Sequence, residues 1–313
     1  LEEAPEILTF ADEELSPVEE EEEEEETVKV QYYKGQEYRY NDALSCLMIL
    51  GIDNYGITES STYYNDGQAD FILLAVFDHD NKTCTLIQIN RDTMADVPVL
   101  DVFGHKVGYI QRQIALAHTF GKGLEDSCEN TEIAVSRLLY DVDIDNYFAL
   151  TMDAIPILND LVGGVTVTIE DDFTGIDDTL VKGETVTLDA DNVEHYVRSR
   201  YSMQDDPTNI ARMRRQGTYL ASLFSALTEA VAKDSSFVMN AYSQVDDYLV
   251  TDCTIDEMSD YSEQFSGYTL SEIISPEGES VKGEVFMEFY VDEPSLQQLV
   301  IETFYTPAEE AAE

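Results

Sequence analysis

The stretch FILLAVFDHDNKTCTLIQINRDT (residues 71–93) decides the fold of this chain. Two apolar runs flank a turn at Asp80 and Asn81, a pattern that predicts a β-hairpin. Residues 71–77 scarcely alternate between apolar and polar side chains, so we expect both faces of this strand to be buried. A strand buried on both faces belongs to a sheet that helices cover on each side.

Outward from this hairpin, strands and helices intermix along the whole chain. The run LSCLMILGID (44–53) predicts a buried strand that ends in a loop at Gly51 and Asp53. Further strands are expected at 147–150, 165–169, 268–274 and 285–289. Helices are expected at 110–120, 132–140, 154–161, 188–197 (capped by Asp189 or Asp191), 209–232, 236–248, 255–263 and 294–304. This mixture indicates a layered α/β fold.

The chain is strongly acidic. It has a formal net charge of −48 and only 17 Lys and Arg in 313 residues. A nucleic-acid partner needs a basic footprint, so the charge argues against DNA or RNA binding, and equally against charge-driven binding to an anionic membrane surface. The hydrophobic fraction of 43% is enough for a sizeable core.

The acidic residues are concentrated at the N-terminus. Residues 1–26 contain 14 Asp or Glu and end in eight consecutive glutamates. Like charges at this density repel, so we predict a disordered acidic linker over 1–42 and a disordered tail over 307–313. Residues 43–306 are predicted to form one domain, with core motifs at 43–235 and a C-terminal extension at 236–306. The first residue is Leu and no apolar run reaches the roughly 18 residues of a membrane span. A membrane anchor is expected upstream of this sequence.

Arginines gather in the stretch YVRSRYSMQDDPTNIARMRRQ (196–216), which holds five of the 17 basic residues. Two interpretations stay open at this point. The cluster is either an anion site, because the guanidinium fork suits phosphate, or a solvated helix surface with ion pairs.

Helical geometry divides these arginines. In the helix expected from 209, Arg212 shares a face with Arg215 and Gln216, whereas Arg214 points away as a surface ion-pair residue. Arg215 either faces the site or braces an acidic side chain. Two residues rotate a helix by about 200°, so Arg198 and Arg200 reach one site only if the preceding helix ends near Arg198 and the chain becomes extended.

Seven blocks, taken in order, resemble the LytR–CpsA–Psr (LCP) family of cell-envelope enzymes. They are ILGID (49–53), GQADFILLAVFD (67–78), LIQINRDT (86–93), IALAHTFGKG (114–123), DNYFALTMDAIPILNDLVGGVTVTI (145–169), GETVTLDADNVEHYVRSR (183–200) and ARMRRQ (211–216). The resemblance implies a three-layer α/β/α sandwich with a central mixed sheet and a deep apolar pocket for a prenyl chain. It also implies an extracellular phosphotransferase that moves a glycopolymer from an undecaprenyl-pyrophosphate carrier to peptidoglycan with Mg²⁺ present.

The family's site residues carry over position by position. Asp53 and Asp70 match the carboxylates that hold magnesium. Arg91, Arg198 and Arg200 match the catalytic arginines, and with Arg212 and Gln216 they are expected to bind the pyrophosphate. Catalysis at a pyrophosphate rests on positioned cations, and Mg²⁺ takes one or two carboxylates plus phosphate and water, so the physics agrees with this set.

The chain departs from the family pattern at four positions. Gln68 and Ala69 stand where the family usually has Arg-Ser, and Gln113 and Ala115 stand where it usually has a lysine and an asparagine. Fewer cations at a phosphate site can lower activity by orders of magnitude. An alternative hypothesis is therefore a degenerate, non-catalytic binder of polyprenyl-phosphate lipid or cell-wall glycan.

A few residues have two interpretations that sequence leaves open. Asp92 either orients an arginine or caps a strand end, and His118 and His195 are expected to be surface or packing residues. The four cysteines show no metal-ligand spacing and allow three disulfide pairings or none.

Overall fold

The computed structural model describes residues 29–199, 209–234 and 236–308. Its centre is a mixed sheet whose described strands run in the order β11-β8-β3-β4-β5-β12. The strands β3, β4 and β5 pair antiparallel in succession, whereas β8 runs parallel to β3 and β12 parallel to β5. Their bounds are β3 Leu44–Ile52, β4 Ala69–Asp78, β5 Thr83–Ile89, β8 Asn146–Thr151, β11 Leu249–Thr251 and β12 Thr269–Ile274.

The predicted hairpin is confirmed. β4 and β5 pair in register from Asp78 opposite Thr83. The Asp78 carboxylate accepts hydrogen bonds from the backbone N–H groups of Asp80 and Asn81, at 3.0 and 2.8 Å. The turn is therefore held by the side chain that precedes it.

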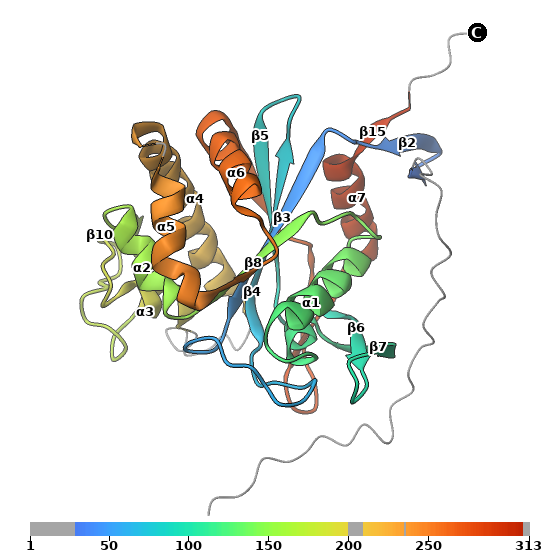
Figure 1. The fold of residues 1–313 in the computed structure, drawn as a ribbon, viewed down its shortest axis with the longest axis horizontal. Helices are drawn as coiled ribbons and strands as arrows, with labels where there is room; N and C mark the ends of the chain where they lie inside the picture. The colour runs from blue at the N-terminus through green and yellow to red at the C-terminus, as the bar shows by residue number, and fades with distance from the viewer. Residues whose placement is uncertain (1–28, 200–208, 235, 309–313) are drawn as a thin grey trace, which may run out of the picture.

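Helices cover both faces of the sheet, which confirms the three-layer α/β/α sandwich (Figure 1). One face carries α2 Ala154–Leu161, α3 Val193–Arg198, α4 Ile210–Lys233, α5 Phe237–Val245 and α6 Ile255–Gly267. The other carries the 3-10 helix η1 Ile114–Thr119, α1 Glu125–Leu138 and α7 Glu293–Phe304. No helix in the described part of the chain is both long and apolar enough to span a membrane.

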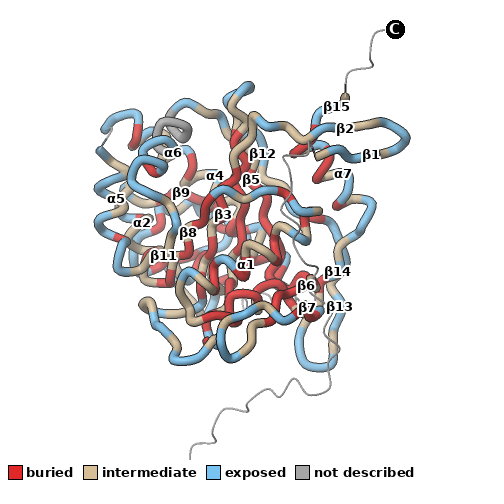
Figure 2. The backbone as a smooth tube through the Cα atoms, turned by 45° about the vertical axis from the view of Figure 1, so that its right-hand side comes forward, coloured by how far each residue is buried: buried red, intermediate tan, exposed pale blue. Residues whose placement is uncertain are grey.

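Successive side chains of the central strands point alternately into the two cores on either side of the sheet. On β4, Leu74 packs with the core under α1 and α7, whereas its neighbour Leu73 joins the core under α4 and α6. Figure 2 shows that the buried backbone is concentrated in this sheet. The expectation that both faces of residues 71–77 are covered is thus confirmed.

The prediction of a disordered linker over 1–42 is wrong for its last part. Residues 29–42 contain the strands β1 Val30–Tyr33 and β2 Gln36–Tyr40. They form a small antiparallel sheet with β15 Tyr305–Pro307, so the ordered domain also extends one residue past 306. Tyr38 and Tyr40 pack against the main core, which accounts for the order of so polar a segment. Residues 1–28 and 309–313 lie outside the described part.

The helix expected at 110–120 is also partly wrong. Its first residues belong to β7 Lys106–Gln113, which pairs with β6 Met94–Leu100 and places Ile110 opposite Val97. Only the remainder is helical, as η1. The Asp101 carboxylate accepts the N–H groups of Phe103 and His105 and closes this second hairpin, which overrides the apolar spacing.

Other boundaries move by a few residues. α1 begins at Glu125, before the expected 132, and α3 begins at Val193, after the expected 188. Asp189 accepts the N–H groups of Asp191 and Asn192 in the turn before α3. The remaining elements are β9 Thr166–Thr168, β10 Thr185–Thr187, η2 Asp246–Tyr248, β13 Gly278–Lys282 and β14 Met287–Val291.

Candidate functional site: an apolar cavity closed by arginines

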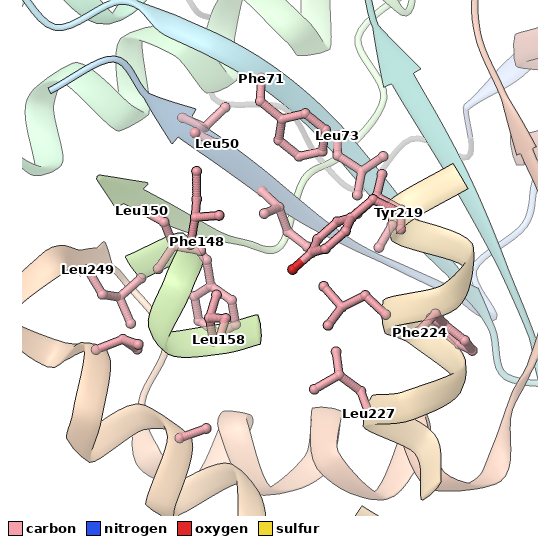
Figure 3. Close-up of a pocket in the computed structure, with 18 of the residues that line it drawn as sticks. Leu50, Phe71, Leu73, Phe148, Leu150, Leu158, Tyr219, Phe224, Leu227 and Leu249 are labelled. Atoms are coloured by element: carbon pink, nitrogen blue, oxygen red, sulfur yellow. The ribbon is translucent and has the colours of Figure 1, made fainter. Parts of the chain in front are cut away.

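An apolar cavity of about 350 Å³ lies between the sheet and the helices α2, α4, α5 and α6. In Figure 3, Leu73 and Phe148 from the sheet and Tyr219 and Leu227 from α4 border the same space. The cavity is lined on one side by side chains of the strands, such as Leu47, which is fully buried from solvent, and on the other by the helices. Its lining suits a hydrocarbon chain.

One end of this cavity is polar, because Asp70, Arg198, Arg212 and Gln216 also line it. Asp70 is the second residue of β4, and Arg212 is in the first turn of α4. The fold therefore brings the start of β4 and the start of α4 to one place.

Asp70 lies between two buried arginines. It accepts hydrogen bonds from Arg91 Nη1 and from Arg212 Nη1, the latter at 3.1 Å. The side chains of Arg91 and Arg212 are only 10% and 5% exposed, and charges so poorly solvated require ionic partners. Arg212 Nε also donates to Asn209 Oδ1 at 2.7 Å, which fixes the plane of the guanidinium group.

Arg198 also lines the cavity. Its Nη2 donates to Asp53 Oδ1 at 2.5 Å, and its Nη1 donates to Glu194 Oε1 at 2.5 Å and to the Tyr55 hydroxyl at 3.1 Å. Burial acts to lower the pKa of Arg198, but the bond to Glu194 and the charge of Asp53 outweigh it and raise this pKa. The hydrogen bond to Glu194 raises the pKa of Tyr55 above its usual range.

The end of α3 confirms the geometric condition on Arg198. The helix ends there, and Ser199 is extended with ψ 128°. Arg215 Nε donates to the Tyr196 carbonyl at 3.0 Å, Arg215 Nη2 to the Ser199 carbonyl, and Gln216 Nε2 to the Val197 carbonyl at 3.2 Å. Side chains of α4 therefore satisfy carbonyl groups that the end of α3 leaves unpaired. Arg200 lies outside the described residues.

Arg214 and Arg215, which are neighbours on α4, differ in burial. Arg214 is about half exposed and pairs with Glu170 and Asp171, so the predicted surface ion-pair role is confirmed. Arg215 is buried and donates to Asp171 at 2.6 Å, which selects the second interpretation, an arginine that braces an acid. Gln216 lines the cavity, but its Oε1 accepts from Gln88 Nε2 at 3.0 Å and its amide donates to Val197.

Asp53 and Asp70 occupy neighbouring strand ends. The Asp53 N–H group donates to the Gln68 carbonyl at 2.9 Å, two residues before Asp70. Both carboxylates are engaged by arginines. No group of three or more His, Cys, Asp or Glu that could hold a metal occurs among residues 29–199, 209–234 and 236–308. The donor set fits an Mg²⁺ ion that takes most of its ligands from phosphate and water, and it does not fit an all-protein cage.

The four departures from the family pattern have defined environments. Gln68 Oε1 accepts from Arg91 Nη2, and Gln113 Nε2 donates to Asp92 Oδ1 at 2.8 Å and to the Met287 carbonyl at 2.6 Å. Ala69 and Ala115 are fully buried. Asp92 Oδ1 lies 3.5 Å from Arg91 Nε, which favours its role as an arginine partner. Gln113 thus tethers the C-terminal hairpin β13–β14 rather than adding a cation.

Sequence reasoning missed three contributors: Tyr55, Glu194 and Asn209. Glu194 lies four residues before Arg198, and Asn209 three before Arg212, so helical spacing could have found both. Tyr55 comes from the β3–β4 loop and had no such signal.

The histidines and cysteines have structural roles or none. His118 is buried, its Nδ1 donates to the Gly67 carbonyl at 2.9 Å, and burial lowers its pKa to about 4. His195 Nδ1 lies 2.8 Å from Asp177 on the surface. All four cysteines lie in described regions and are free, and burial raises the pKa of Cys46 and Cys128 far above the usual range. None of the possible disulfide pairings is formed.

The α/β/α sandwich thus contains an apolar cavity, and arginines and a carboxylate are among the residues that line it. A sequence model described as the LytR_cpsA_psr family matches residues 8–303. The chain belongs to this family.

Two characterised relatives are polyisoprenyl-teichoic acid–peptidoglycan teichoic acid transferases. The chain is 24% identical to TagU of Enterococcus faecalis over 217 residues and 25% identical to TagV of Bacillus subtilis over 236 residues. These matches cover 68% and 72% of this chain, but only 62% and 54% of the relatives' own lengths.

Solved structures show the same fold. The structure described as TagT bound to LIIa-WTA has a TM-score of 0.63 and 20% identity, and covers 84% of this chain and 90% of that one. The crystal structure of B. subtilis TagV has a TM-score of 0.62 and 22% identity, and covers 85% of this chain and all of the other.

Proposed function

We propose that this protein is a phosphotransferase that moves a glycopolymer from a polyprenyl-pyrophosphate carrier to peptidoglycan and releases the lipid monophosphate. It acts at the extracellular face of the cell membrane, and the full-length protein carries an N-terminal anchor. One observation supports this most strongly: the apolar cavity ends at Asp70, Arg198 and Arg212. A ligand with a long hydrocarbon chain and a pyrophosphate head matches both parts. The activities for which the TagU and TagV relatives are named agree with it.

The arginines would act on the charge of the reacting phosphates. An acceptor hydroxyl of peptidoglycan attacks the sugar-linked phosphorus, and the bond from this phosphorus to the bridging oxygen breaks. The lipid monophosphate leaves with that oxygen, and the proton that the hydroxyl loses balances the charge of the leaving phosphate. Negative charge grows on the leaving phosphate, where Arg91, Arg198 and Arg212, together with Arg200, stabilise it. The cavity holds the lipid so that the pyrophosphate stays between the arginines.

Asp53 and Asp70 are the residues that would hold Mg²⁺. When bound, the ion would supply positive charge that stabilises the reacting phosphates. With the ion bound, the arginines that these carboxylates contact would be available to the anion.

A binder without turnover is the second candidate. It is favoured by Gln68 and Gln113, because both are neutral side chains at positions where the family pattern has cations, and both hydrogen-bond to charged neighbours in the protein. Such a protein would hold the lipid in the same cavity but stabilise the transition state poorly.

A transfer assay separates these candidates. The protein is incubated with a lipid-pyrophosphate-linked sugar, Mg²⁺ and peptidoglycan, and released lipid monophosphate is measured. We expect Mg²⁺-dependent release. Arg212→Ala should reduce its rate by about 10²–10³-fold, because a buried donor to the phosphate is lost. Arg214→Ala, on the same helix but half exposed and facing Glu170, is the matched control and should retain near wild-type release.

Two results would contradict the enzyme. Tight lipid binding with no release of lipid monophosphate would exclude the phosphotransferase and leave the non-catalytic binder as the function. Equal release rates in the Arg212 and Arg214 variants would show that the arginines lining the cavity do not take part in the reaction. Circular dichroism of both variants checks that Arg212→Ala, which removes one arginine partner of Asp70, still folds.

A further inference from the structure

Tyr55 stands beside the arginine end of the cavity with a hydroxyl group that is fully engaged. It lies in the loop between β3 and β4, and the residue is 64% exposed. Its hydroxyl donates to Glu194 Oε1 at 2.5 Å and accepts from Arg198 Nη1 at 3.1 Å. The Arg198 guanidinium carbon is 5.9 Å from the centre of its ring. An exposed tyrosine has no need of two such partners for its own solvation.

The two ends of the Arg198 guanidinium group have different kinds of partner. Nη1 contacts Glu194 and Tyr55, neither of which the family resemblance assigns to the site. Nη2 contacts Asp53, one of the two proposed metal carboxylates. If Asp53 turns to a metal, only the Nη2 end is released.

An arginine released at both ends would lose its orientation. The side chain is 35% exposed, and a long side chain at such a site recovers rotamer freedom once its contacts are gone. The Nη1 contacts prevent this. Glu194 lies one helical turn before Arg198 on α3, and Tyr55 approaches from a separate loop, so the two contacts define a plane for the guanidinium fork.

We propose that Tyr55 and Glu194 are positioning residues that hold Arg198 by Nη1 while its Nη2 exchanges Asp53 for a substrate phosphate. The inference rests on the proposed function and adds the device that keeps one arginine aligned during the exchange. Tyr55 suits this role because its hydroxyl is neutral. It orients the guanidinium group without adding a second negative charge that would compete with phosphate for Arg198.

Isothermal titration with inorganic pyrophosphate in the presence of Mg²⁺ tests the positioning role without requiring turnover. We expect Tyr55→Phe to weaken binding roughly fivefold, because it removes one hydrogen bond to a charged group at a partly exposed site. Glu194→Gln keeps an acceptor for Nη1 but also removes a charge that competes with phosphate, so Tyr55→Phe is the deciding variant. The matched control is Tyr32→Phe, which removes a hydroxyl that donates to Glu37 at 2.8 Å on the small β1–β2 sheet and should leave binding unchanged.

A double-mutant cycle on pyrophosphate affinity distinguishes a positioning role from a merely structural one. In an Arg198→Ala background, Tyr55→Phe should have no further effect, because the group it positions is gone. The inference is overturned if Tyr55→Phe binds like wild type, or if it weakens binding equally in both backgrounds. Loss of binding in Tyr55→Ala with full binding in Tyr55→Phe would assign the role to the ring instead and also overturn it.

Failure of the proposed function gives a different result. Wild-type protein that binds no pyrophosphate with Mg²⁺ would overturn the anion site itself, and this inference with it. Wild-type binding that is insensitive to Tyr55 and Glu194 would leave the proposed function standing and remove only the positioning role.

Discussion

The two faces of the central sheet use the same strands and similar side chains, yet they are filled differently. Under α1 and α7, residues such as Met48 and Leu74 belong to a continuous core without an apolar cavity of comparable size in the described residues. Under α4–α6, Leu73 and Phe148 border the cavity of about 350 Å³. Hydrophobic pattern alone therefore predicts burial, but it does not predict whether protein atoms or a ligand complete the packing.

This difference in packing means that one side of the sheet contributes mainly to stability and the other mainly to ligand binding. The packed face, which is the core under α1 and α7, derives its stability from side-chain contacts. The open face, which is the side under α4–α6, retains an apolar cavity. Substitutions on the two faces should consequently change different measured quantities.

Two neighbouring leucines give the largest contrast. Leu74→Ala creates a new cavity in the packed face and should reduce the free energy of unfolding by about 4 kcal/mol. Leu73→Ala enlarges a space that is already open and should cost about 2 kcal/mol, while it weakens lipid binding. Urea unfolding of both variants measures the difference. Equal losses of stability would mean that the two faces are packed alike.

The packed face should also respond to acid through His118. Burial lowers the pKa of His118 to about 4 from 6.5, so between these values the unfolded chain binds a proton that the folded protein does not. The corresponding stability, about 3 kcal/mol, is present above pH 6.5 and is lost as the pH falls to about 4.

The test compares wild type with His118→Asn, whose amide can still donate to the Gly67 carbonyl. The stability difference between the two proteins should shift in favour of the variant by about 3 kcal/mol between pH 6.5 and 4. An imidazole titration midpoint near 6.5, observed by NMR, would refute this account of His118.

Filling the open face should leave the fold intact and remove the ligand. Ala241 of α5 lines the cavity and is partly exposed. Ala241→Trp should weaken binding of a polyprenyl phosphate about 30-fold, equivalent to about 2 kcal/mol, with little change in thermal stability. The control is Ala134→Trp in α1, a fully buried position on the packed face, which should destabilise the protein by overpacking. Unchanged lipid affinity in Ala241→Trp would place the lipid elsewhere.

The smallest expected effect comes from Glu132 on α1. Burial, and then the charges of Asp252, Glu129 and Asp145, raise its pKa to about 7. The folded protein therefore holds this proton more tightly than the unfolded chain, and stability is lost as the pH rises through 7. Glu132→Gln should be more stable than wild type by about 1 kcal/mol at pH 8, after allowance for solvent screening, and about equal at pH 4. Thermal unfolding that shows the same difference at both pH values would contradict this.

Local signals in the sequence located most of the fold. The hairpin at residues 71–93 and the helix α2 at Ala154–Leu161 follow from turn chemistry and apolar spacing, and both are confirmed. The strands β1 and β2 could not be found this way. Their order depends on β15, which lies more than 260 residues away in the chain, and on tyrosines that pack against a core formed elsewhere.

In the candidate site, too, local sequence signals located some residues, whereas others depend on contacts between distant parts of the chain. Asp53, Asp70, Arg91 and Arg212 could be named because each matches a motif at a strand end or helix start. The partners that orient them could not, because they converge from separate elements. Gln113, for example, donates to the carbonyl of Met287, which is 174 residues further along the chain. The end of α3 at Arg198 is an exception, since helical rotation set it as the condition for Arg198 and Arg200 to reach one site.

The central claim is that one ligand occupies the apolar cavity and the arginine end together. A crystal structure of the protein with a polyprenyl pyrophosphate tests it most directly. The account predicts density for the hydrocarbon chain between Leu73, Phe148 and α4, with the pyrophosphate in contact with Arg91, Arg198 and Arg212. A lipid bound outside this cavity, or a pyrophosphate that contacts none of these arginines, would contradict it.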